Sequence, residues 1–290
     1  MIFMEQDEYL KKAHKILIRL LTEFDRVCTK HNLRYYLICG SLLGAVREGK
    51  LIPWDDDVDV AMPRKDFEKL KQIAKEYWSS GDFLFVDYDQ IGKHVFLDFM
   101  TRLVYIKESI PVNVYKKAGK KIHKELDGHM PMDIYVLDHA CNDEKKHQRH
   151  VLLIQGIYGL AMGHRAVIDY NEYKTETAKR QKQIRTLNCI GKIIPLKVLF
   201  WLYEKVRVLY SEQDTDCYYE SNGWIYCIPW KFPKGWFGEG IRIEVNGYKI
   251  MAPQDYHSFL IRHYGKKYMM PPPEHKRKPN HAEWADGIFQ

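Results

Sequence analysis

The sequence predicts an α+β fold with a mixed β-sheet core, flanking helices and a mainly helical C-terminal extension. Two observations indicate this class. Short apolar runs, some alternating at a period of two, are interleaved with apolar residues at helical spacing up to about residue 140. The pattern then becomes mainly helical over residues 142–212. Because no internal repeat or low-complexity linker separates them, we expect an N-terminal core (1–140) and a C-terminal part (141–290) packed as one body.

The N-terminal part is expected to alternate helices with strands. Ser41 is a typical N-cap residue, Gly49 a typical residue after a helix, and Pro63 a typical helix start. The expected elements are a helix at 5–31, a strand at 35–40, a helix at 41–50, a strand through 52–60, a helix from 63 to about 77, and strands at 83–87, 94–99, 102–107 and 130–138.

The C-terminal part is expected to hold helices, one hairpin and a basic tail. Its apolar and basic segment 192–210 fits either a buried amphipathic helix or a helix lying on a membrane surface. The dipeptide Asn246-Gly247 predicts the turn of a hairpin over 241–252. A last helix should end at Gly265, before a proline-rich tail.

Composition excludes several classes of protein. The chain is 46% hydrophobic and 29% charged, as in ordinary globular proteins. Its first residues are too acidic for a signal peptide, and no apolar run reaches the roughly 18 residues that cross a bilayer. The six cysteines form no CxxC pair, so we expect reduced, non-catalytic thiols in a cytoplasmic protein. The net charge of +7 suits phosphorylated small molecules, anionic glycans or an anionic membrane face, and no nucleic-acid-binding motif is present.

The stretch IPWDDDVDV at residues 52–60 is the strongest chemical signal. On a strand, Asp55, Asp57 and Asp59 would share one face, roughly 6–7 Å apart, and Asp56 would point the other way. Two carboxylates 4 Å apart repel by about 4 kcal/mol at a dielectric constant of ~20. The simplest alternative is a solvated acidic turn. The strand-like context instead favours a site for Mg²⁺ (or Mn²⁺), which binds carboxylate oxygens and serves phosphoryl transfer.

The dipeptide Gly40-Ser41 precedes these aspartates at an expected strand-to-helix turn. Backbone N–H groups at a helix N-terminus bind phosphate, and a glycine lets the phosphate approach closely. The order strand, Gly-Ser, helix, then a strand with D-x-D is the pattern of the nucleotidyltransferase fold. A carboxylate from a neighbouring strand usually completes such a site, and Asp133 is the first candidate, with Asp98 second.

The run LICGSLLGAVREGKLIPWDDDVDVAMPRKDFEKL (37–70) closely resembles the LicD family, which is related to the fukutin-type transferases. The resemblance extends to PMDIYVLD (131–138), to YHSFLIRHYGKKYMMPPPEHKR (256–277) and to His281. It implies metal-dependent transfer of phosphocholine or another alcohol phosphate, such as ribitol phosphate, from a CDP-linked donor. CDP-choline is the favoured donor, and the implied acceptor is a glycan or lipid-linked glycan precursor of the cell surface.

The resemblance also implies roles for single residues. Gly40 and Ser41 would bind donor phosphate, and Arg47 and Arg64 could reach it. Asp57 and Asp59 would bind the metal with Asp55 as a helper, and Asp133 could accept the proton of an acceptor hydroxyl. The enzyme would work in the cytoplasm, where it could also contact the inner membrane face.

Two other functions remain open at this point. One is a nucleotidyltransferase that moves NMP from NTP to a small molecule or RNA, and the other is a non-catalytic glycan- or nucleic-acid-binding protein. Two further groups have weaker patterns. We expect the histidines of 139–150 to lie on a helix surface rather than to bind zinc, and the aromatic residues of 218–237 to pack in a core or lid rather than to form a choline cage.

Overall fold

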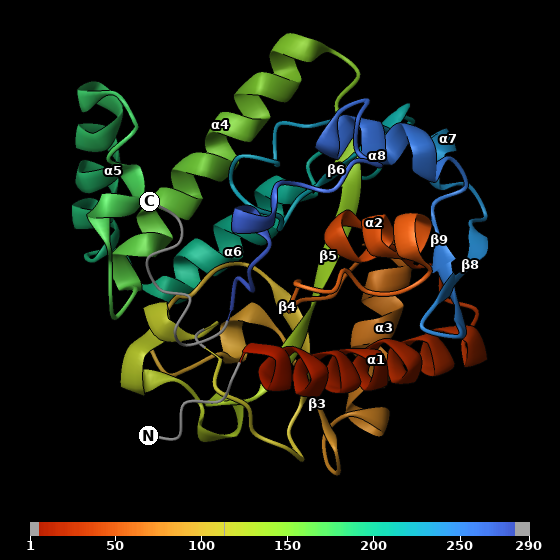
Figure 1. The fold of residues 1–290 in the computed structure, drawn as a ribbon. Helices are drawn as coiled ribbons and strands as arrows, with labels where there is room; N and C mark the ends of the chain where they lie inside the picture. Colours follow the sequence, from red (N-terminus) through yellow and green to blue (C-terminus); the bar gives the residue numbers. More distant parts are fainter. Residues whose placement is uncertain (1–5, 113, 282–290) are drawn as a thin grey trace.

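The computed structural model describes residues 6–112 and 114–281. Its centre is a seven-stranded mixed sheet in the order β1-β2-β5-β4-β3, with β6 pairing to β5 and β7 to β6 (Figure 1). Strands β2 and β5 are parallel, and the other pairs are antiparallel. The strands are β1 (Tyr36–Leu37), β2 (Asp59–Pro63), β3 (Phe83–Val86), β4 (Thr101–Tyr105), β5 (Met130–Ala140), β6 (Cys217–Glu220) and β7 (Phe232–Pro233).

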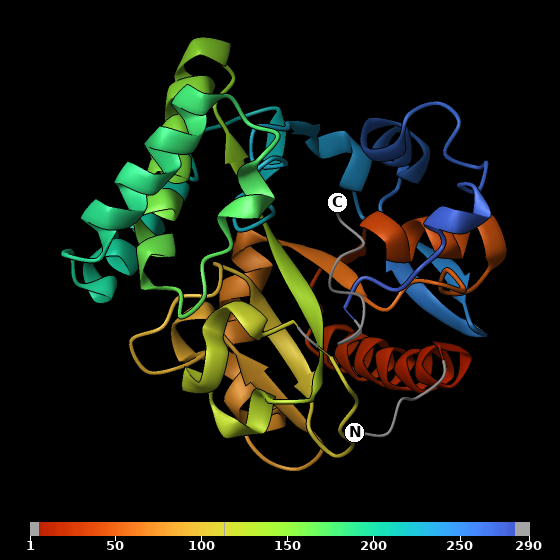
Figure 2. The same ribbon diagram turned by 60° about the vertical axis from the view of Figure 1, so that its left-hand side comes forward.

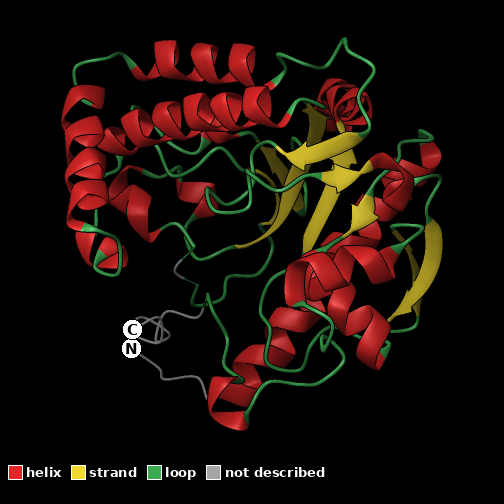
Figure 3. Cartoon of the chain, turned by 90° about the horizontal axis from the view of Figure 1, so that it is seen from above, coloured by secondary structure: helices red, strands yellow, loops and turns green. Residues whose placement is uncertain are grey.

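Helices surround this sheet, which confirms the predicted α+β, nucleotidyltransferase-like class. The helices are α1 (Gln6–Lys30), α2 (Cys39–Glu48), α3 (Arg64–Tyr77), α4 (Glu144–Ala161), α5 (Ala178–Gly191), α6 (Leu196–Arg207), α7 (Lys234–Phe237) and α8 (Tyr256–Tyr264). Helices α4, α5 and α6 lie together to one side of the sheet (Figure 2; Figure 3). The predicted hairpin is confirmed as β8 (Ile241–Val245) and β9 (Tyr248–Ala252), which turn at Asn246 and Gly247 with positive φ angles.

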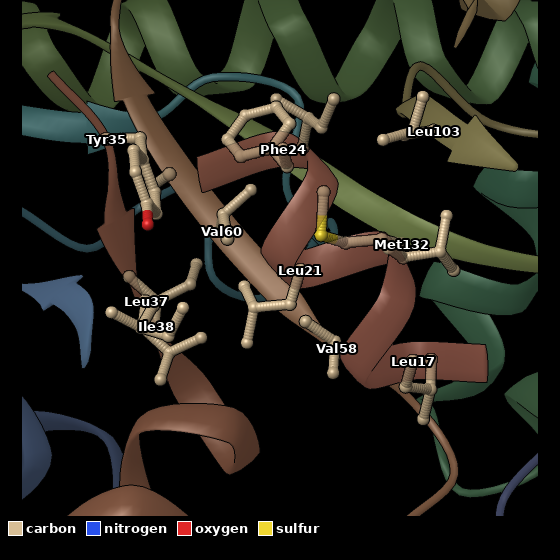
Figure 4. Packing of buried hydrophobic residues seen from close by; sticks show 14 of the residues in the cluster. Leu17, Leu21, Phe24, Tyr35, Leu37, Ile38, Val58, Val60, Leu103 and Met132 are labelled. Carbon is tan, nitrogen blue, oxygen red and sulfur yellow. The ribbon is translucent and has the colours of Figure 1, made fainter. Parts of the chain in front are cut away.

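The main apolar core lies between helix α1 and the sheet. The helical spacing of α1 places Leu17, Leu21 and Phe24 on one face, and all three are fully buried. Figure 4 shows these side chains beside Val58, which directly precedes β2, and Met132, which lies in β5. This packing fixes the position of β2, and therefore of the aspartates that lead into it.

A second apolar cluster joins the two parts of the chain. Phe99, which precedes β4, stacks on Tyr203 of α6 with ring centroids 3.5 Å apart. Tyr158 of α4 belongs to the same cluster. Strand β6 also extends the sheet through antiparallel pairing of Leu137 with Glu220. On these contacts we base the proposal that residues 1–140 and 141–290 form one body.

Three local predictions were wrong. Residues 94–99 form no strand, although Val95, Phe96, Leu97 and Phe99 are buried; their apolar character reflects burial in an irregular segment. Helix α2 starts at Cys39, so Ser41 is not its N-cap, and Ile38 takes that position without a side-chain cap. The aspartate stretch is a loop until β2 begins at Asp59.

Within the segment 192–210, helix α6 has one buried face and one exposed face, which is consistent with the buried amphipathic helix that was expected. Helix α6 buries Leu199 and Tyr203, while Trp201 on the same helix is exposed. Within the described residues, no single helix is long and apolar enough to cross a membrane. Helices α5 and α6 reach that length and composition only as a pair, across a bend of 119°.

Candidate active site

The carboxylates of Asp59 and Asp133 come from neighbouring parallel strands. Asp59 is the first residue of β2 and pairs in register with Asp133 of β5. The backbone N–H of Asp133 donates to the carbonyl of Val58 over 3.0 Å, which locks this register. Asp59 is buried, and its pKa is raised well above the ordinary value by burial and by the charges of Asp57 and Asp133. The fold therefore places two carboxylates together that are distant in the sequence.

Asp55 and Asp57 reach the same place from the loop before β2. They do not share the face of a strand, so the predicted geometry was wrong at this point. Their carboxylates nevertheless interact directly. Burial and then the charge of Asp57 raise the pKa of Asp55 well above its ordinary value. Burial also favours neutral Asp57, but a hydrogen bond from His281 and its positive charge outweigh this and lower the Asp57 pKa.

The Gly40-Ser41 turn faces this cluster. A Cβ atom added to Gly40 would lie 2.5 Å from Oδ2 of Asp55, so any side chain here would push that carboxylate away. The Ser41 hydroxyl oxygen accepts a hydrogen bond of 2.9 Å from the backbone N–H of Asp59. The first turn of α2 and the start of β2 are thus joined directly, which holds the α2 N-terminus beside the aspartates.

Asp56 fastens two distant segments to the loop. Its carboxylate accepts hydrogen bonds from the Tyr9 hydroxyl (2.9 Å) and from the backbone N–H groups of Asn280 (2.7 Å) and His281 (2.9 Å). Asp56 is 2% exposed. Although it is no candidate metal ligand, it holds the C-terminal segment against the site.

His281 supplies positive charge to the cluster. Its Nε2 lies 3.3 Å from Oδ2 of Asp57. Burial lowers the pKa of His281, but the hydrogen bond with Asp57 and the charges of Asp57 and Asp56 raise it to about 9. A small pocket opens here, lined by Asp57, Asp133, His281 and the apolar residues Val114 and Met130. A protonated imidazole at this pocket partly balances the aspartates.

Arg102 of β4 is a site residue that the sequence analysis did not identify. It pairs in register with Asp133, and its Nε lies 2.9 Å from Oδ1 of that residue. The same guanidinium binds both carboxylate oxygens of Asp98, at 2.9 and 2.8 Å. Asp98 therefore orients Arg102, and Arg102 contacts Asp133. The only sequence signal for this pair is the spacing D-x-x-x-R at 98–102.

The two predicted arginines lie in different surroundings. Arg64 follows the far end of β2 from Asp59, and its guanidinium pairs with Asp138 at 2.8 Å and 2.5 Å. We therefore leave Arg64 out of the proposed site. Arg47 pairs with Glu48 at 2.8 Å and lies over the ring of Trp54, 5.5 Å from its centroid. Arg47 is packed inside the protein and is not a solvated helix residue.

The histidines of residues 139–150 were expected on a helix surface, but two of them are buried. His147 and His150 are buried, and each has Nε2 beside a backbone carbonyl, of Pro229 and Val206 respectively. In the described part of the chain, the grouping with metal-binding geometry consists of Cys39, Glu220 and His263. This grouping does not include the aspartates, so their role as metal ligands stays a prediction.

Some aromatic residues of 218–237 pack on one another, as Tyr218 and Phe232 do on Phe237, and others make contacts elsewhere. Tyr219 is fully buried and donates its hydroxyl to the Arg207 carbonyl over 2.6 Å. Trp224 is 64% exposed and meets Tyr226 edge to face. Trp230 lies under the guanidinium of Arg262. These contacts favour packing over a cage.

Comparison with known proteins connects this geometry with a family. Residues 32–126 match the model of the LicD/FKTN/FKRP nucleotidyltransferase domain, which includes the Gly40-Ser41 turn and the aspartates at 55–59. The chain is 25% identical to the lipopolysaccharide cholinephosphotransferase LicD of Haemophilus influenzae, over 95% of this chain and 97% of that protein. It is 49% identical over 41 residues to the ribitol 5-phosphate transferase FKRP of Mus musculus and of Homo sapiens, which is 14% of this chain and 8% of each of those proteins.

Proposed function

We propose, from the premise that this chain belongs to the LicD family, that it transfers an alcohol phosphate from a CDP-linked donor to a hydroxyl of a cell-surface glycan precursor. Phosphocholine is the favoured group, because a relative that matches over 95% of this chain is named a cholinephosphotransferase. The observation that carries the proposal is the convergence of Asp55, Asp57, Asp59 and Asp133 next to the N-terminus of α2. We place the reaction in the cytoplasm, where nucleotide-activated donors are made.

The donor phosphates would bind at the first turn of α2. Its free backbone N–H groups and the positive end of the helix dipole favour an anion there. Ser41 holds this turn against Asp59 through its hydroxyl, so the phosphates and the carboxylates keep a fixed relation. His281 and Arg102 add positive charge on the pocket side. These residues orient the donor and balance its charge, which is the larger part of catalysis in phosphoryl transfer.

The aspartates fit a hard divalent cation. They offer only oxygen ligands, Asp59 is buried while Asp55 and Asp57 are half-buried, and each raises the pKa of a neighbour by its charge. Asp57 and Asp59 would hold Mg²⁺ (or Mn²⁺), with Asp55 beside them. When bound, the ion would neutralise charge that develops on the transferring phosphoryl group.

Asp133 is the proposed base for the acceptor hydroxyl. Its side chain is 28% exposed and lines the pocket, so an acceptor can reach it. Burial raises the pKa of Asp133, although the Arg102 charge opposes this. A carboxylate with a raised pKa holds a proton better during transfer. Arg102 would keep the carboxylate turned toward the pocket.

A donor screen tests this function. Purified protein with Mg²⁺ is incubated with CDP-choline, CDP-ribitol or CDP-glycerol and a glycan acceptor, including lipid-linked forms, and products are identified by mass spectrometry. We expect release of CMP and a gain of one alcohol phosphate on the acceptor. Turnover of an NTP with release of pyrophosphate would instead support NMP transfer, which the nucleotidyltransferase description of the matching domain keeps as the second candidate.

A further inference from the structure

Three side chains with metal-binding chemistry meet outside the aspartate cluster. Cys39 is the first residue of α2, Glu220 the last of β6, and His263 lies in the last turn of α8. A ligand atom from each lies within 4.8 Å of the other two, and His263 Nε2 is 3.8 Å from Glu220 Oε1. In a tetrahedral zinc site, with bonds of about 2.0–2.3 Å, ligand atoms lie roughly 3.3–3.8 Å apart. Small side-chain rotations would bring this group to that spacing.

The polar atoms of this group are buried without hydrogen-bond partners. The side chains of Glu220 and His263 are 1% and 7% exposed. Glu220 Oε1 and His263 Nε2 are both withdrawn from water and accept or donate no hydrogen bond in the structure. Each such atom costs about 1–3 kcal/mol when it is left unsatisfied. A ligand that binds both atoms would remove this cost, and the two atoms already face each other.

The surrounding protein fixes the orientation of the ligands. The His263 imidazole stacks on Phe232, with ring centroids 5.4 Å apart and planes inclined by 7°. The backbone of Glu220 is held by its pairing with Leu137. Cys39 has a φ angle of 51°, a left-handed conformation that non-glycine residues seldom adopt. Backbone strain of this kind persists where the surrounding structure imposes it.

We propose that Cys39, Glu220 and His263 bind a Zn²⁺ ion at a second metal site, distinct from the aspartates that face the pocket. One thiolate, one imidazole nitrogen and one carboxylate oxygen form a donor set typical of zinc and unsuited to Mg²⁺, which requires oxygen ligands. Binding would release to solvent the thiol proton of Cys39 and the proton that the buried Glu220 carboxyl carries without metal. Three protein ligands leave the fourth tetrahedral position to water or another small ligand.

The ion would affect the donor site by fixing the position of the residues beside it. Cys39 immediately precedes Gly40, and Glu220 and His263 come from the C-terminal part. An ion bound to all three would therefore anchor the start of α2 to β6 and α8. This inference does not depend on the reaction proposed above, because metal content and the cobalt spectrum are measured without donor or acceptor.

Metal content and a cobalt spectrum test the proposal. The full chain, purified without chelators, should contain about one zinc ion per molecule by elemental analysis, as expected for a three-ligand protein site. Replacement of zinc by Co²⁺ should give thiolate-to-metal charge-transfer absorption. Cys39→Ser should abolish that absorption and lower zinc retention at least tenfold, and His263→Gln should lower retention similarly. Cys189→Ser is the matched control, since Cys189 is a free, exposed cysteine of α5.

Two outcomes would overturn the proposal. One is wild-type protein that binds no zinc even after the metal-free form is dialysed against excess Zn²⁺, a test that requires no variant to fold. The other is Co²⁺-loaded wild-type protein without thiolate charge transfer. Asp57→Asn separates this site from the aspartates, because it should leave zinc content and the cobalt spectrum unchanged. Loss of both in Asp57→Asn would contradict the existence of a separate site.

Discussion

The contact between His281 and Asp57 predicts a pH-dependent contribution to stability. The pKa of His281 is raised from 6.5 to about 9 in the folded protein, chiefly by Asp57 acting against burial. The difference of about 2.5 units corresponds to about 3 kcal/mol. Because the His281 side chain is 34% exposed, solvent screens part of this, and we expect about 1–2 kcal/mol.

The sign follows from the direction of the shift. A group whose pKa is higher in the folded state stabilises the fold fully below its unfolded pKa of 6.5, and this contribution is lost as pH rises through about 9. The lower limit of the window is set by Asp57, whose own pKa lies below its ordinary 3.8. The contribution should therefore be present from about pH 4 to 6.5 and fall toward zero near pH 10.

Urea unfolding of wild-type protein and His281→Gln measures this contribution in buffer with a metal chelator. Gln keeps a neutral hydrogen-bonding group and the backbone N–H that Asp56 binds, so the comparison isolates the charge. The free energies of unfolding should differ by about 1–2 kcal/mol at pH 5–6.5 and converge near pH 10. In an Asp57→Asn background the difference should become much smaller, and only the part due to Asp56 and Asp133 should remain. A difference that is independent of pH, or that is as large without Asp57 as with it, would refute the reasoning.

Further predictions concern the aspartate loop and the turn before it. Asp59→Asn should leave the metal-free protein as stable or more stable, by up to about 2 kcal/mol from relieved repulsion, while transfer falls by orders of magnitude; a wild-type rate in folded protein would exclude Asp59 as a metal ligand. Asp56→Asn should lower the free energy of unfolding by about 2–3 kcal/mol and raise KM for the donor, because its carboxylate holds residues 280–281; unchanged urea unfolding would show that this anchor is dispensable. Gly40→Ala should weaken donor binding about tenfold in calorimetry, since its Cβ would displace Asp55, and unaltered affinity would remove Gly40 from the site.

The sequence predicts elements best where a local period is strong. Helices α1 and α3, strand β5 and the hairpin at Asn246-Gly247 follow from spacing or turn chemistry within a few residues. Residues 94–99 are as apolar as a strand, yet they fill the space between other elements without a partner strand. Their burial could be predicted, but their conformation depends on contacts with α4 and α6.

The same distinction holds for the candidate site: residues close together in the sequence could be predicted, and residues joined by long-range contacts could not. The Gly40-Ser41 turn and the aspartates stand within 20 residues of one another, so a motif can reveal them. The sequence predicted only that Asp56 would point the other way from its neighbours, and its partners Asn280 and His281 lie more than 220 residues later. Arg102 has no motif of its own and becomes a site residue only through strand pairing with Asp133. Such long-range contacts leave no period or spacing in the sequence.

The anchoring of His281 beside Asp57 also affects how the chain is synthesised. These residues are 224 positions apart, so at a synthesis rate of about 5–20 residues per second, the ribosome makes the histidine roughly 10–45 s after the aspartate. During this interval the nascent chain carries the acidic loop without the cation that later lies beside it. The N-terminal elements can pack in that time, but the charge balance of the loop is reached only after His281 has been made.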